Sequence, residues 1–296
     1  MNPYKRLMQR LHNGEKIVID GATGTEIERR GVPQVKHAWN GGGALSHPDI
    51  LRQVHEDYIR NGAEIVISNT FATGRHVLRD AGWEEHFDLL NRRGVEIADE
   101  ARANVNAEGV LVAGGITHWS FTSQHPPYDE LHANVSEQAN IMKEAGADLL
   151  MLEMMVDIER MLVLLDAAQQ TGLPVWVGFS TKADDEGVIR LWDGPTLADA
   201  IAAIEDKDVP LVNIMHTYIQ YIEPSLDVLD QHWSGLVGVY AQSGGYIKSK
   251  WLFDEVLSPE DYAAEAQKWL DRGVQVVGGC CGVGVDHIAM LNTLVG

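Results

Sequence analysis

Eight short apolar runs, each followed by a segment long enough for a helix, constrain the fold of this chain more than any other feature. Their near-continuous apolar character is typical of parallel strands that are buried on both faces. The predicted strands lie at residues 16–20, 64–70, 110–116, 149–155, 174–180, 209–216, 235–242 and 274–280. The predicted helices lie at residues 46–61, 84–107, 128–145, 157–171, 196–206, 221–233, 259–272 and 284–295.

The boundaries of these segments support one continuous alternation of strands and helices. Four predicted helices end in a glycine shortly before the next strand, at Gly62, Gly146, Gly172 and Gly273. No linker divides the chain, so we predict a single (β/α)8 TIM barrel over residues 1–296. A doubly wound open sheet is the alternative. The residues after the first strand, GATGTEIERRG, lack the second and third glycines of the GxGxxG fingerprint that such a sheet often carries.

The net charge limits the classes of molecule that the protein is expected to bind. The chain has 43 Asp and Glu against 23 Lys and Arg, a formal net charge of −20. Such a surface repels phosphate backbones, which argues against nucleic-acid binding. No stretch approaches the roughly 20 apolar residues of a membrane span, and the N-terminal residues lack the apolar segment of a signal peptide. We therefore expect a cytoplasmic protein whose partners are small molecules; a homo-oligomer is left open.

The two cysteines of the chain, Cys280 and Cys281, are adjacent and lie at the end of the eighth predicted strand. The glycines on both sides let the backbone turn sharply, so both thiolates can reach one metal ion. Two sulfur ligands favour zinc or another thiophilic ion. A pair of small cysteines buried in the core is the alternative.

Polar residues also close most of the other predicted strands. In a TIM barrel the carboxyl ends of the strands gather at one face, where active sites form. The polar strand ends are Asp20-Gly21, Asn69-Thr70, Glu153, Asn213 with His216, Gln242-Ser243 and Cys280-Cys281. We predict that the functional site lies among these residues.

Three stretches are distinctive: DGATGTEIERRG at 20–31, GADLLMLE at 146–153 and GGCCG at 278–282. Together with HPDILRQVHEDYIRNGAEIVISNTF and GVYAQSGGY, they resemble the homocysteine S-methyltransferase family from about residue 18 to residue 294. That family contains the betaine–homocysteine and S-methylmethionine–homocysteine methyltransferases and the homocysteine module of cobalamin-dependent methionine synthase.

The resemblance implies a zinc-containing barrel in which the metal binds the thiol of homocysteine. A free thiol, with a pKa of about 8.5, is mostly protonated at neutral pH, whereas a metal-bound thiol is deprotonated. The thiolate then takes a methyl group from a sulfonium or quaternary ammonium donor, which gives methionine. No general base is needed, so no side chain is predicted to be catalytic beyond the metal-activated substrate thiol.

The resemblance also implies which residues bind the substrates. Asp20, Gly21 and Glu153 match positions that hold the amino group of homocysteine, and a carboxylate pairs well with an ammonium group. Trp39 matches an aromatic residue of the donor pocket in the betaine enzyme, and a tryptophan face attracts a methylated cation. Asn69 completes the predicted substrate-binding set. Purely structural alternatives are a helix N-terminus for Glu153, an Asx turn for Asp20 and ordinary packing for Trp39.

The chain departs from the family at the third metal ligand. Ile214 stands where the family usually has a third cysteine, at the end of the sixth predicted strand. His216 lies two residues further on, and alternation along a strand predicts that it faces as Ile214 does. We therefore predict a metal set of Cys280, Cys281 and His216, because Cys2His is a known catalytic zinc set. The alternatives are a hydrogen-bonded loop histidine at His216 and, as the third ligand, His118.

The donor and the acceptor are less constrained by the sequence. Ala72 and Met154 stand where aromatic residues line the donor pocket of the betaine enzyme, so sulfonium donors stay open beside methylammonium compounds. The predicted function is zinc-dependent methyl transfer to homocysteine. One alternative is methyl transfer to another small thiol or selenol. A second alternative is a metal-free barrel that binds a methylated metabolite without catalysis.

Overall fold

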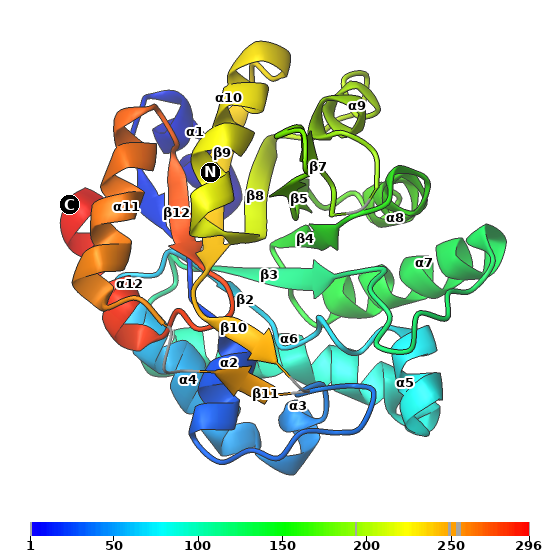
Figure 1. Cartoon of the computed structure of the whole chain (residues 1–296). Coiled ribbons are helices and arrows are strands. Elements are labelled where there is room, and N and C mark those ends of the chain that lie inside the picture. The colour runs from blue at the N-terminus through cyan, green and yellow to red at the C-terminus, as the bar shows by residue number, and fades with distance from the viewer. Residues whose placement is uncertain (1, 193, 248–249, 253–255, 296) are drawn as a thin grey trace.

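The computed structural model describes residues 2–192, 194–247, 250–252 and 256–295 (Figure 1). Eight parallel strands form one sheet in the order β1-β12-β9-β8-β5-β4-β3-β2. A parallel bridge between Ile19 and Ile65 joins the two ends of this sheet, which closes the barrel. The strands are β1 (Ile17–Val18), β2 (Ile65–Ile67), β3 (Leu111–Ile116), β4 (Leu149–Met155), β5 (Val175–Phe179), β8 (Leu211–Tyr218), β9 (Leu236–Gln242) and β12 (Val276–Gly279). The predicted (β/α)8 barrel is confirmed, and the open sheet is wrong.

Helices surround this sheet on its outside (Figure 1). All eight predicted helices are present, and the four glycines predicted to end helices adopt positive φ values between 76° and 105°. These helices are α4 (Pro48–Arg60), α6 (Phe87–Asn104), α7 (Tyr128–Glu144), α8 (Ile158–Gln169), α9 (Leu197–Ala202), α10 (Ile222–His232), α11 (Pro259–Asp271) and α12 (Val285–Val295). None of the helices in the described part of the chain is both long and apolar enough to cross a membrane.

Several short elements were not predicted, because they lie before the first strand or within the connections. Helix α1 (Pro3–His12) lies at the amino-terminal end of the barrel, where Leu7 and Leu11 pack against the barrel interior and the hydroxyl of Tyr4 accepts a hydrogen bond from Trp176. The others are α2 (Thr23–Arg29), α3 (Gly43–Ser46), α5 (Arg75–Ala81), the 3₁₀ turns η1 (Glu84–His86) and η2 (Ile219–Tyr221), and the hairpins β6 (Lys182–Ala183)–β7 (Ile189–Arg190) and β10 (Gly245–Ile247)–β11 (Lys250–Leu252).

The apolar core has two parts, as the geometry of a filled barrel requires. The outer core lies between the strands and the helices, and the interior cluster fills the barrel itself. Phe71, Trp119, Trp192 and Cys280 are partly buried and pack against the interior cluster. All four follow the carboxyl end of a strand, so the rim of the barrel at this end is largely aromatic.

One buried histidine predicts how stability depends on pH. His55 on α4 is fully buried, and neither of its ring nitrogens has a hydrogen-bond partner among the described residues. Burial lowers the pKa of His55 to about 4. Below about pH 6.5, His55 therefore binds a proton in the unfolded chain but stays neutral in the folded chain. The free energy of unfolding decreases as the pH falls from 6.5 toward 4.

Replacing His55 by leucine is expected to remove this part of the pH dependence. Between pH 7.5 and pH 5, wild type should lose about 2 kcal/mol of unfolding free energy through His55. Urea unfolding at the two pH values measures the difference. His132→Leu is the matched control, because His132 is half-exposed and hydrogen-bonds Asp166 on the surface. An unchanged pH dependence in His55→Leu would contradict the assignment.

Candidate metal and substrate site

The two cysteines lie in a tight turn, here called the cysteine turn (residues 280–284), that follows β12. Gly282 adopts a φ of 84°, and a Cβ atom there would lie 1.7 Å from the carbonyl oxygen of Ser243. The backbone N–H of Cys280 donates to Ala241 over 2.8 Å, and that of Ser243 donates to the carbonyl of Cys281 over 2.8 Å. The turn is thus held against the end of β9, and its close approach requires glycine.

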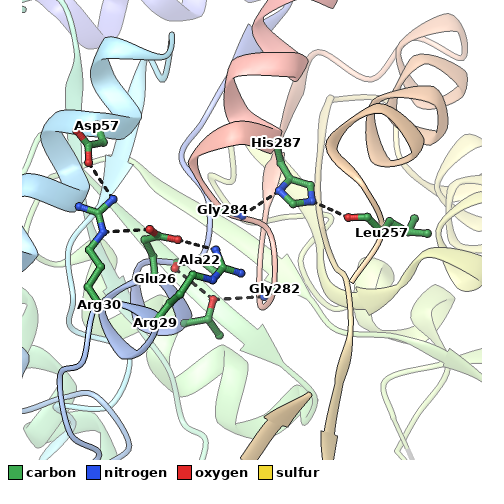
Figure 2. Close-up of polar contacts among 10 residues, drawn as sticks. Ala22, Glu26, Arg29, Arg30, Asp57, Leu257, Gly282, Gly284 and His287 are labelled. Carbon is green, nitrogen blue, oxygen red and sulfur yellow. Dashed lines mark hydrogen bonds and ion pairs between the residues drawn. The ribbon is translucent and has the colours of Figure 1, made fainter. Parts of the chain in front are cut away.

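The other face of the cysteine turn contacts the segment after β1. A Cβ atom on Gly21 would lie 2.4 Å from the carbonyl oxygen of Val283, and the N–H of Ala22 donates to that same oxygen over 2.9 Å. The N–H of Gly282 donates to Thr25 Oγ1 on α2 over 3.3 Å. Figure 2 shows α2 beside the turn, where Glu26 pairs with Arg29 and Arg30. Gly21 therefore brings the β1 end directly onto the cysteine turn.

His216 reaches the cysteines by a route that alternation did not predict. Ile214 is fully buried in the outer core, so it points toward the helices and away from the barrel interior. A register shift between Met215 and Tyr218, together with a φ of 45° at His216, breaks the alternation after Ile214. The prediction that His216 faces as Ile214 does is therefore wrong. A bulge redirects the imidazole, as bulges beside functional sites often do.

Three candidate metal ligands come together in this structure, namely His216, Cys280 and Cys281. Each offers one ligand atom, and these atoms all lie within 4.8 Å of one another. Nδ1 of His216 is 3.4 Å from Sγ of Cys280, and the two sulfur atoms are 3.9 Å apart. The hydrogen bond with Cys281 and the nearby His216 lower the pKa of the Cys280 thiol, while burial raises the pKa of the Cys281 thiol. Two sulfur atoms and one imidazole match the donor set of a thiophilic metal with one position left for a substrate.

Two buried carboxyl groups lie near the cysteines. Asp20, at the end of β1, is 1% exposed, and its Oδ2 accepts a hydrogen bond from the N–H of Ile67 over 2.8 Å. Glu153 on β4 is 8% exposed. Burial raises the pKa of both carboxyl groups, and the negative potential of Cys280 raises them further. A bound cation would reverse this cost, so the pair is suited to an ammonium group.

A second bulge places Glu153. The register between β4 and β5 shifts between Leu152 and Met155, and Met154 has a φ of 57°. The space for the carboxyl group comes from Gly115 on β3, because a Cβ atom there would lie 2.5 Å from Glu153 Oε2. The carboxyl group of Glu153 lies close enough to Cys280 and Asp20 for both to raise its pKa, in addition to the larger effect of burial.

The remaining predicted residues have structural contacts of their own. Nδ2 of Asn69 donates to the carbonyl of Asn40 over 3.0 Å, which fixes the loop that carries Trp39. The ring of Trp39 packs edge-on against Phe71 and lies 2.5 Å from where a Cβ atom of Gly24 would be. His118 is buried, and its Nε2 accepts from the N–H of Val156 over 3.4 Å. It lies outside the group formed by His216 and the cysteines.

Sequence reasoning missed three aromatic residues near the site. Trp192 stacks on His216, with ring centroids 6.2 Å apart and planes 17° apart, and Trp119 packs edge-on against Trp192. The hydroxyl of Tyr240 is buried without a hydrogen-bond partner among the described residues, and burial near Glu153 raises its pKa. Tyr240 could have been found, because it lies two residues before Gln242 on the same face of a predicted strand. The position of Trp192, in a long connection, gave no such signal.

Comparison with known proteins agrees with this geometry. A family model described as homocysteine S-methyltransferase matches residues 17–295. The chain therefore belongs to the homocysteine S-methyltransferase family, and it is a methyltransferase. This finding confirms the resemblance seen in the sequence and overturns the alternative of a barrel without catalysis.

Individual relatives are distant but match along nearly their whole length. Homocysteine S-methyltransferase YbgG of Bacillus subtilis is 26% identical, with 97% of this chain and 96% of the relative covered. Selenocysteine methyltransferase of Astragalus bisulcatus is 26% identical, with 94% of this chain and 92% of the relative covered. The metallated form of the homocysteine methyltransferase MmuM from Escherichia coli has a similar fold, with a TM-score of 0.81, 23% identity and 99% of both chains covered.

Proposed function

We propose that this methyltransferase transfers a methyl group from a sulfonium or quaternary ammonium donor to the thiolate of homocysteine in a zinc-dependent reaction, which gives methionine. The observation that carries the proposal is the convergence of His216, Cys280 and Cys281 beside the buried carboxyl groups of Asp20 and Glu153. A soft three-ligand set next to two carboxyl groups suits a substrate that has both a thiol and an ammonium group.

Cys280, Cys281 and His216 would hold the zinc ion. When bound, zinc would keep the acceptor thiol deprotonated at neutral pH, as it does other coordinating thiols. Since the thiolate then exists before methyl transfer begins, none of the chain's residues has to remove a proton during the transfer. The contribution of the chain is to position the acceptor and the donor in line.

Asp20 and Glu153 would bind the ammonium group of the acceptor. The charge of that group stabilises the ionised carboxylates, which burial otherwise disfavours. Gly21 brings the β1 end into contact with the cysteine turn, and both carboxyl groups lie close enough to Cys280 to be affected by its charge, so one small molecule would contact the ammonium and thiol sites together. This spacing favours a short amino acid such as homocysteine.

The donor would approach from the rim of the barrel. Trp39, the residue predicted for this role, lies there together with Phe71. Aromatic faces attract a methylated sulfonium or ammonium group by cation–π interaction. As the methyl group moves to the acceptor sulfur, the electron pair of the broken bond stays on the donor, which leaves as a neutral thioether or amine.

A selenol acceptor is a second candidate. It is favoured by the selenocysteine methyltransferases of Astragalus bisulcatus and Brassica oleracea, which are each 26% identical to this chain. Comparing homocysteine with selenocysteine under the same donor would distinguish the two acceptors.

Replacing His216 by alanine tests the metal assignment. Wild type purified without chelator is expected to contain one zinc ion per chain by elemental analysis. Losing an outer partner of a metal ligand costs about 10–100-fold in metal affinity, so losing the ligand itself should cost at least that much. His132→Ala, a surface histidine variant, should keep the wild-type zinc content. A folded His216→Ala variant with full zinc content would remove His216 from the site.

A further inference from the structure

A closed ring of hydrogen bonds surrounds the cysteine turn on the side of α11 and α12. The N–H of Ser243 donates to the carbonyl of Cys281 over 2.8 Å, and Ser243 Oγ accepts from the N–H of Leu257 over 2.8 Å. The carbonyl of Leu257 pairs with Nε2 of His287 over 2.9 Å, and Nδ1 of His287 accepts from the N–H of Gly284 over 3.3 Å. The turn itself, from Cys281 to Gly284, completes the ring.

His287 is the one side chain of this ring that bridges two separate backbone segments (Figure 2). Its two hydrogen bonds define its state: Nδ1 must accept and Nε2 must carry the proton, which only one neutral tautomer allows. Burial lowers the pKa of His287, so the neutral form is favoured. A phenylalanine could fill the same space but could make neither hydrogen bond.

The surroundings of His287 restrict its position further. The side chain is 7% exposed and packs edge-on against Tyr262 of α11, at a ring-centroid distance of 5.8 Å. The hydroxyl of Tyr262 donates to the carbonyl of Gly278 over 2.8 Å, two residues before Cys280. His287 and its neighbour Tyr262 thus support the chain on the two sides of the cysteines.

The ring also joins the turn to the two ends of a connection. Ser243 precedes the hairpin β10–β11 and Leu257 follows it, so the bond between these two residues closes the base of the hairpin. His287 then fastens that base to Gly284, three residues after Cys281.

We propose that His287 is a positioning residue of the metal site: its neutral imidazole bridges Gly284 and Leu257 and thereby sets the direction in which Cys280 and Cys281 present their sulfur atoms. The inference rests on the proposed function, in which these cysteines bind zinc. His287 does not touch the metal, and it acts through the backbone of the cysteine turn. Losing a group that orients a metal ligand typically lowers metal affinity by about 10–100-fold.

Three variants test this proposal. His287→Phe keeps the volume but removes both hydrogen bonds, whereas the amide of His287→Gln can accept from Gly284 and donate to Leu257. Thr293→Ala is the control, because Thr293 is an exposed residue of the same helix. The zinc dissociation constant is measured by competition with a chromogenic chelator. The cobalt-substituted proteins are compared by their sulfur-to-cobalt charge-transfer and d–d absorption, which report ligand number and geometry.

His287→Phe is expected to raise the zinc dissociation constant about tenfold or more and to change the d–d bands of cobalt. His287→Gln should recover most of the affinity, and Thr293→Ala should equal wild type. Wild-type affinity and an unchanged cobalt spectrum in His287→Phe would overturn the proposal, even if that variant melts at a lower temperature. A loss of stability alone is what a purely structural histidine would show.

Two further measurements keep the proposal independent of the proposed function and of the folding of one variant. Alkylation rates of Cys280 and Cys281 in metal-free protein, followed by mass spectrometry, should rise several-fold for buried Cys281 in His287→Phe. Equal rates would contradict the positioning role whether or not wild type binds zinc.

If His287→Phe does not fold, Ser243→Ala breaks the same ring at another bond and should weaken zinc binding in the same direction. Unchanged binding there would also overturn the proposal.

Discussion

Replacing Cys280 and Cys281 by serine, singly or together, is expected to abolish zinc binding and to lower the rate of methyl transfer by at least about 1000-fold. A serine hydroxyl is close in size to a thiol, but it stays protonated at neutral pH and is a poor ligand for a thiophilic ion. Elemental analysis and the rate of methyl transfer to homocysteine measure the two effects. Each single variant should lose both zinc binding and methyl transfer, because both sulfur atoms belong to the ligand group.

The fold must survive these substitutions for the result to be informative. Circular dichroism and urea unfolding of each variant check this point, with Thr293→Ala purified in parallel as a remote control. If one single variant keeps full zinc content and rate, the cysteine that it replaces is not a ligand. If the double variant keeps full activity, the zinc-dependent mechanism is wrong.

Replacing Glu153 by glutamine is expected to raise the KM for homocysteine about 10–100-fold, because a charge-assisted hydrogen bond contributes about 1.5–3 kcal/mol. Glutamine keeps the shape of the side chain beside Gly115 but cannot carry the negative charge that the ammonium group needs. The KM for the donor should stay near the wild-type value. Steady-state kinetics with each substrate varied in turn measures both constants.

Glu159→Gln is the matched control for this prediction, because Glu159 is an exposed residue in the first turn of α8. It removes one carboxylate of the same type without touching the barrel interior. An equal rise in both KM values for Glu153→Gln would contradict the role of Glu153 in binding the acceptor. Such a result would point to a general disturbance of the site.

The architecture could be predicted from the sequence because its signals are local. The strand predicted at 149–155 matches β4 residue for residue, since its apolar run has clear ends. Helix α1 was not predicted, although it begins with standard local signals, since Asn2 caps it by accepting from Lys5 and Pro3 occupies its first turn. The shorter elements within the connections depend on contacts with distant residues, which local patterns do not reveal.

The sequence could predict which residues form the candidate site better than it could predict how they are arranged in space. A glycine-flanked cysteine pair marks a potential metal site by residue type alone. The position of His216, however, depends on a bulge whose positive φ falls on a residue other than glycine, and nothing in the local sequence signals it. The same is true of His287, whose partners Gly284 and Leu257 meet only because two helices and a hairpin converge.

The left-handed backbone at Trp39, Met154, Trp192 and His216 has a consequence for attempts to engineer this protein. A residue with a Cβ atom in this conformation costs about 1 kcal/mol or more relative to glycine. Glycine at Met154 would relieve this strain but would also remove a buried side chain of the interior cluster, which costs about 2–5 kcal/mol and outweighs the gain. Variants selected for heat resistance alone should therefore keep Met154 and its left-handed backbone, and with it the bulge that places Glu153.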